Sequence, residues 1–194
     1  MAWEAHADPC THARIIRFLI QFGYGDDPRT RSVIEWLLAT QRDDAMWLCS
    51  WARGHGCLRA TLDFLRVASL DPATAAHPAT ARAATVVVGL LMEPNMGRYH
   101  VGDGWTILVY PYFGYGLIPA LEALARLGYT ADHPKIAAAV DYLISRKLPD
   151  GSWPLDERVS RPPLDFSQPS EPNKWLTLDT LRTLKQLGCL EVSM

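Results

Sequence analysis

Three of the four cysteines are the residues whose type and position point most directly to chemistry. Cys10 and Cys57 each lie where an amphipathic run begins, and Cys49 lies in the connector just before Cys57. Thiolates are good zinc ligands and good nucleophiles, and a helix N-terminus lowers the pKa of a thiol placed there. Their spacing is not that of a Cys-x-x-Cys pair, and small buried thiols without reactivity are the alternative interpretation.

A histidine is the natural fourth ligand of such a set. His55 lies between two glycines and close to Cys57, where the backbone can present its imidazole as a ligand or as a base. His12 and His100 are further candidates. We expect a metal site, for zinc, formed by Cys10, Cys49, Cys57 and His55. If the protein is an enzyme, the expected catalytic residues are Cys10, Cys57 and His55.

Large aromatic residues gather between positions 92 and 116. An aromatic cavity suits an apolar chain or a cation, through burial and cation–π attraction. An ordinary packed core is the alternative. The residues expected to bind such a ligand are Trp105, Tyr110, Tyr112, Phe113 and Tyr115.

An internal repeat indicates which elements position these groups. Gly23 is matched by Gly128 at an offset of 105, and Pro28 by Pro134 at an offset of 106. The offset of 106 then holds as far as Trp47 and Trp153. Weaker copies lie between and after these two, so the repeat unit is about 50 residues, within the range of helical arrays.

Each repeat unit is predicted to form two helices. Apolar residues recur at helical spacing within 15–22, 33–38, 57–67, 78–92, 121–127, 136–144 and 175–187. Glycine ends the first helix of a unit, and proline at the first helical position opens the second. No alternating pattern of useful length is present, so no strands are expected. The segments 92–116 and 154–174 are expected to be long ordered loops.

The end of the third unit carries a recognisable signature. The residues Asp150-Gly151-Ser152-Trp153 follow a predicted helix, and the first unit has the matching Trp47 but carries Ala45 in place of the glycine. Helix followed by Asp-Gly-Ser-Trp resembles the repeat of the terpenoid cyclase and protein prenyltransferase superfamily. Pro9-Cys10 and the segment 23–28 are similar to bacterial proteins with the prenyltransferase and squalene oxidase repeat. The resemblance spans about residues 8–188.

The resemblance implies an all-α fold, an α/α toroid, of which residues 1–194 would form about three and a half helical hairpins in one domain. Inner helices of a toroid run parallel, so the cysteines at their N-termini would converge at one end. Asp8-Pro9-Cys10 also has the Asp-x-Cys form that supplies two zinc ligands in protein prenyltransferases. An open arc exposes an apolar edge, and we therefore expect a homodimer.

The same family uses acidic motifs that this chain lacks. Neither the Asp-x-Asp-Asp acid of class II terpene cyclases nor the Asp-Asp-x-x-Asp magnesium motif of class I enzymes is present. Asp26 and Asp27 are interpreted as helix caps. Whether the protein is an enzyme therefore stays open, and a prenyltransferase-like or cyclase-like enzyme would have to work without these motifs.

Composition narrows the remaining choices. The 194 residues are 48% hydrophobic and carry a net charge of −2, which disfavours nucleic acid as a partner. No apolar run is long enough to span a membrane, residues 1–9 do not read as a signal peptide, and we expect a cytoplasmic protein. The expected function is binding of a hydrophobic, isoprenoid-like ligand in the aromatic-lined axial cavity. The alternative is a non-catalytic helical-repeat module for protein interactions.

Overall fold

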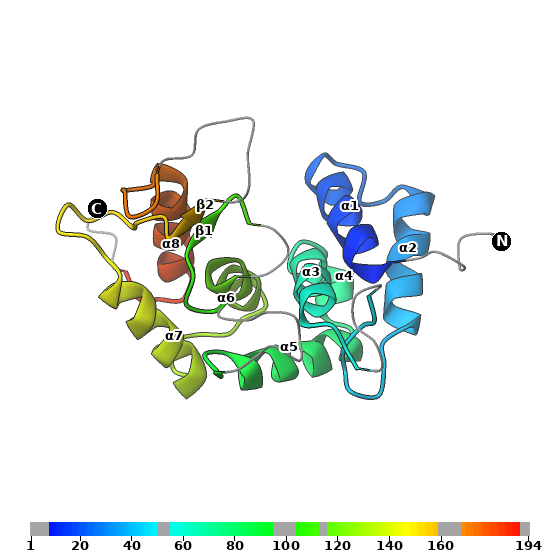
Figure 1. Cartoon of the computed structure of the whole chain (residues 1–194). Helices are drawn as coiled ribbons and strands as arrows, with labels where there is room; N and C mark the ends of the chain where they lie inside the picture. The colour runs from blue at the N-terminus through cyan, green and yellow to red at the C-terminus, as the bar shows by residue number, and fades with distance from the viewer. Residues whose placement is uncertain (1–7, 50–54, 95–103, 113–115, 159–167, 191–194) are drawn as a thin grey trace. The chain divides into compact units, whose positions relative to one another are not determined.

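The computed structural model describes residues 8–49, 55–94, 104–112, 116–158 and 168–190. Within them the chain forms eight helices and two strands of two residues each (Figure 1). The helices are α1 (Pro9–Gln21), α2 (Pro28–Ala39), α3 (Leu58–Ala68), α4 (Pro72–Ala75), α5 (Pro78–Leu90), α6 (Leu117–Arg126), α7 (Pro134–Ser145) and α8 (Lys174–Gln186). The strands are β1 (Val109–Tyr110) and β2 (Glu157–Arg158). The expected all-α class is confirmed. The toroid and the single domain remain predictions.

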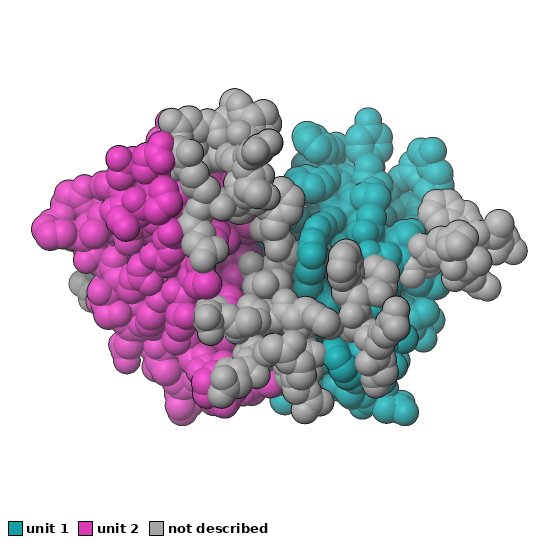
Figure 2. Space-filling view, viewed as in Figure 1, with its two compact units in different colours: residues 1–87, 96–102 teal, residues 88–95, 103–194 magenta. Residues whose placement is uncertain are grey.

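The chain divides into two compact units (Figure 2). Unit 1 comprises residues 1–87 and 96–102, and unit 2 comprises residues 88–95 and 103–194, so the boundary falls within α5. In unit 1, α1 packs against α2 and α3. In unit 2, α6 packs against α8. No helix among the described residues has the length and apolar character that a membrane crossing requires.

The helix boundaries follow from local chemistry in the way that the repeat predicts. Gly23 and Gly128 end their helices with φ of 87° and 89°, a left-handed conformation that glycine adopts without a steric penalty. The side chain of Asp27 accepts a hydrogen bond from the backbone N–H of Arg29 at the start of α2. His133 caps α7 in the same way. Each cap satisfies one of the free amides of the first turn.

The two matched tryptophans form the same contact in the two units. The indole N–H of Trp47 donates to the carbonyl oxygen of Leu37 at 2.6 Å, and that of Trp153 donates to the carbonyl oxygen of Leu143, also at 2.6 Å. Both side chains are almost completely buried. The repeat identified in the sequence is therefore a repeat of structure, in which each indole packs against the end of the helix before it.

The turn before each tryptophan carries an alanine in the first copy where the later copy carries a glycine. Ala45 has φ of 61° and Gly151 has φ of 87°, so an alanine holds a left-handed conformation that costs a non-glycine residue about 1 kcal/mol. We expect Ala45→Gly to raise the free energy of unfolding by up to about 1 kcal/mol. Gly151→Ala should lower it by a similar amount, because only the far end of Lys147 lies near the new methyl group. Urea titrations of the two variants measure both signs, and two changes of the same sign would contradict the argument.

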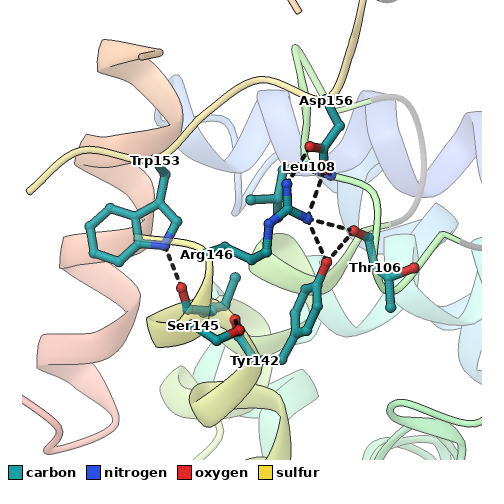
Figure 3. A network of polar contacts seen from close by, with 8 residues as sticks. Thr106, Leu108, Tyr142, Ser145, Arg146, Trp153 and Asp156 are labelled. Atoms are coloured by element: carbon teal, nitrogen blue, oxygen red, sulfur yellow. Dashed lines mark hydrogen bonds and ion pairs between the residues drawn. The ribbon is translucent and has the colours of Figure 1, made fainter. Parts of the chain in front are cut away.

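The expectation of no strands is wrong at two short places. β1 and β2 pair in parallel, with Val109 opposite Glu157. Two-residue strands are too short to produce an alternating pattern, and they lie in the segments expected to be loops. Asp156 holds them together, because its carboxylate accepts from the backbone N–H of Leu108 at 2.7 Å and pairs with the Arg146 guanidinium at the end of α7 (Figure 3).

A buried carboxylate in unit 1 makes the free energy of unfolding depend on pH in the acidic range. Asp71, 6% exposed, pairs with Arg31 at 2.8 Å and caps α4 by accepting from the N–H of Thr74. These contacts, Arg31 first, lower the pKa of Asp71 to about 2. Because the folded value lies below the unfolded one, the contribution is complete above about pH 4 and is lost as the pH falls toward 2.

We expect Asp71→Asn to lower the free energy of unfolding by about 2 kcal/mol at pH 7. The difference in this free energy between the wild type and the variant should disappear as the pH falls from about 4 to 2. Urea unfolding at several pH values measures this. Asp26→Asn is the control, since Asp26 also pairs with Arg31 but is fully exposed. A gap that does not depend on pH would contradict the assignment.

Candidate metal centre

Three buried sulfur atoms lie together in unit 1. The Sγ atoms of Cys10, Cys49 and Cys57 are all within 4.8 Å of one another, and their side chains are 5%, 8% and 2% exposed. In the described part of the chain, these residues form the one group of three or more histidine, cysteine or acidic side chains close enough to share a metal ion. Sulfurs around a tetrahedral zinc ion are about 3.8 Å apart, so a small contraction would bring this set to ligand geometry.

Two helices place two of these sulfurs. Cys10 is in the first turn of α1, and Cys57 is the residue directly before α3. Because α1 packs against α3, the starts of the two helices bring their cysteines together. The expected convergence of Cys10 and Cys57 follows from this pair of helices alone, whatever the arrangement of the complete chain.

A short bridge places the third sulfur. The backbone N–H of Cys57 donates to the carbonyl oxygen of Trp47 at 2.7 Å, which aligns the segment that carries Cys49 alongside the start of α3. The Asp44 carboxylate accepts from the backbone N–H of Gly56 at 3.0 Å. A methyl group on Gly56 would lie 2.3 Å from the Cβ of Met46, so only glycine permits this approach.

Asp44 is a functional residue that sequence reasoning missed. Its carboxylate accepts from the N–H of Met46 within the turn and from Gly56 across the bridge, so it ties the two chain segments that carry Cys49 and Cys57. In the sequence it forms half of an Asp-Asp pair that fails the magnesium motif. Its position in the repeat could have indicated this role, because Asp150, its counterpart in the other copy, accepts a hydrogen bond from the backbone N–H of Ser152 in the same way.

The surroundings of Cys57 and Cys10 shift the pKa values of these two thiols in opposite directions. A hydrogen bond from the Cys10 thiol, and further contacts with Cys49 and the first backbone N–H groups of α3, lower the pKa of Cys57 to about 5 against the opposing effect of burial. The pKa of Cys10 is raised, because losing its proton would break the hydrogen bond to Cys57 and because it is buried. Cys57 is therefore the thiol of this cluster that loses its proton most readily, which favours entry of a cation.

The two described histidine candidates, His12 and His55, do not belong to the group of ligand atoms within 4.8 Å, and a histidine ligand stays a prediction. His55 is half-buried, its Nδ1 is 3.0 Å from the carbonyl oxygen of Gly56, and it is not part of the group of ligand atoms within 4.8 Å. The ring of His12 lies against Trp36, and its Nδ1 is 2.9 Å from the carbonyl oxygen of Asp8. His100 lies outside the described residues.

Asp8 offers a different fourth donor. Its Oδ2 accepts from the Thr11 hydroxyl at 2.9 Å, but its Oδ1 is buried and has no hydrogen-bond partner. A buried carboxylate oxygen without a partner costs free energy, and a cation is one of the groups that can satisfy it. Asp8 lies outside the 4.8 Å group. Its side chain would therefore have to turn toward the sulfurs to bind the same ion.

The described aromatic candidates, Trp105, Tyr110 and Tyr112, lie in unit 2. The ring of Tyr110 stacks on Trp175 of α8 and contacts the edge of Tyr112. Burial, and then the negative charge of Asp179, raise the pKa of Tyr112 well above its usual value. Trp105 is buried, with an indole N–H that has no partner. Phe113 and Tyr115 lie outside the described residues, and ligand binding by this set stays a prediction.

Comparisons with known proteins add no assignment. No protein-family model matches the chain, and a search of curated proteins finds no significant match.

Proposed function

We propose that this protein binds a zinc ion through the thiolates of Cys10, Cys49 and Cys57. The observation that supports the proposal is the mutual proximity of three buried sulfurs within 4.8 Å. Soft thiolate ligands favour zinc over magnesium or calcium. A reducing compartment such as the cytoplasm would keep these thiols available for a metal.

The residues around the cysteines suit such a role. Asp8 carries a buried carboxylate oxygen without a partner and is the candidate for the fourth ligand. When bound, zinc supplies a Lewis acid that holds a sulfur or oxygen ligand in its anionic form. The first backbone N–H groups of α3 hold negative charge on Cys57, and Asp44 fixes the bridge beside it.

The resemblance stated above extends this proposal to a ligand class. A protein of the prenyltransferase type would combine the metal centre with binding of an apolar, isoprenoid-like chain. One described surface is suited to an apolar partner: Ile15 and Phe18 of α1, and Phe22 directly after it, are 52%, 49% and 76% exposed.

Metal analysis of the purified protein tests the metal-binding function. We expect about one equivalent of zinc for each chain, and a clear loss of thermal stability when a strong chelator removes it, because the ion joins α1, α3 and the connector. Less than a tenth of an equivalent after growth with added zinc, together with unchanged stability in chelator, would end the proposal.

A protein-interaction module is the second candidate, and the exposed face of α1 favours it. Three large, exposed apolar side chains on and directly after one helix are typical of a surface covered by a partner. The expected homodimer is one such arrangement. A native mass spectrum reports subunit number, bound metal and any retained apolar ligand together. A metal-free chain retained with a protein partner would favour the module over the metal centre.

A further inference from the structure

An ion pair crosses the same helix interface that brings the thiols together. Arg14 lies four residues after Cys10, one turn further along the same face of α1. Its Nε donates to the Oδ2 of Asp63 on α3 at 2.8 Å. The Asp63 side chain is only 1% exposed, and that of Arg14 is 27% exposed. The two helices that carry Cys10 and Cys57 are thus joined a second time, by a directional contact.

We propose that the Arg14–Asp63 pair is the positioning device of the thiol cluster: it sets the place of α1 along α3 and so keeps Cys10 within ligand distance of Cys57. Apolar packing between two helices tolerates a small slide along the helix axis. A hydrogen-bonded ion pair fixes both the separation and the register. This inference deepens the proposed metal-binding function, but it concerns the distance between sulfurs, which exists without a metal.

Burying the Asp63 carboxylate costs free energy, so the ion pair is better suited to position the two helices than to stabilise the fold. Burial raises the pKa of Asp63 to about 6, against the charges of Arg14, Arg66 and Arg59. An ion pair taken out of water gains little net stability over apolar residues of similar size. A pair of this kind on an interface that also holds three thiols is therefore better explained by the register that it imposes.

The chain offers a matched control in the same unit. Arg31 and Asp71 also form an ion pair at 2.8 Å, and the Asp71 side chain is 7% exposed. This pair joins α2 to the residue before α4, and neither element carries one of the three cysteines. Loss of the control pair should lower stability without moving the sulfurs.

Two readouts in Asp63→Asn and Arg14→Gln test the proposal, with Asp71→Asn as control. The first is zinc affinity, measured by competition with a chromophoric chelator. The second is the rate at which diamide links Cys10 to Cys57 in the metal-free protein carrying Cys49→Ser and Cys189→Ser. In that reaction the two thiols give up two electrons and two protons, one disulfide forms, and diamide is reduced to its hydrazine.

We expect both test variants to weaken zinc binding by about 10- to 100-fold and to slow disulfide formation by about tenfold. Arg14→Lys, which keeps the charge, should recover most of both. Asp71→Asn should change neither by more than about twofold, even though it lowers the melting temperature. If one test variant does not fold, the other decides.

Unchanged affinity and disulfide rate in a folded test variant, or equal changes in Asp71→Asn, would overturn the inference. A wild-type protein that binds no zinc would instead refute the proposed function. The disulfide rate alone would then decide whether the ion pair positions the thiols.

Discussion

Cys57→Ser is expected to reduce bound zinc from about one equivalent to less than a tenth, and to remove the stabilising effect of zinc on thermal unfolding. Loss of an outer contact to a metal ligand typically costs 10- to 100-fold in affinity, and loss of a ligand itself costs more. Among the three cysteines, replacement of Cys57 is expected to have the largest effect, because Cys57 accepts a hydrogen bond from the Cys10 thiol and from the first backbone N–H groups of α3. Elemental analysis and melting curves with and without zinc measure the effect.

Cys189→Ser is the matched control for this experiment. Cys189 follows α8 in unit 2, is partly exposed and does not belong to the thiol cluster. We expect it to keep full zinc content and the full response to zinc. Equal zinc content in the two serine variants would show that the cluster is not the binding site.

Replacement of either matched tryptophan by alanine is expected to lower the free energy of unfolding by about 3–5 kcal/mol, as for other large buried aromatics. Trp47→Phe and Trp153→Phe should each cost less, about 1–2 kcal/mol, because the ring volume is partly kept and mainly the hydrogen bond to the helix carbonyl is lost. Urea unfolding followed by circular dichroism measures these changes.

The two tryptophan positions should differ in their effect on zinc. The carbonyl oxygen of Trp47 accepts from Cys57, and its ring stacks on Phe64 of α3 at 4.1 Å between centroids, so Trp47→Ala disturbs the frame of the thiol cluster. Trp153 lies in unit 2. We expect Trp47→Ala to weaken zinc binding and Trp153→Ala to leave it unchanged. A loss of zinc in both would contradict this separation.

Most helix boundaries were predictable from the sequence, because the residues that start and end the helices act through local contacts. Proline at the first helical position and a capping side chain directly before it, Asp27 for α2 and His133 for α7, act within a few residues and place the starts of these helices. β1 and β2 were not predictable. They depend on Asp156 accepting from Leu108, 48 residues away, and such a contact leaves no periodic signal in the sequence.

The candidate site was predictable in its sulfurs and not in its other members. Cys10 and Cys57 stand at the beginnings of two helices that pack together, and the sequence reveals those beginnings. His55 looked available because two glycines flank it, but Gly56 is there to let the backbone pass Met46. The ion pair between Arg14 and Asp63 could not be predicted from residue type or spacing, because it depends on the packing of α1 against α3.

The duplicated tryptophan turn has a consequence for how this protein can change over time. At the 106-residue offset the counterpart of Cys49 is Leu155, a fully buried side chain. The counterpart of Cys57 is Asn173, because its backbone N–H donates to the carbonyl oxygen of Trp153 as that of Cys57 does to Trp47, and each residue directly precedes a helix. The tryptophan turn of unit 1 thus carries sulfur where that of unit 2 carries an apolar side chain and a helix-capping amide. Substitutions at Leu155 and Asn173 are therefore limited by packing and helix capping, whereas those at Cys49 and Cys57 also change the thiol cluster.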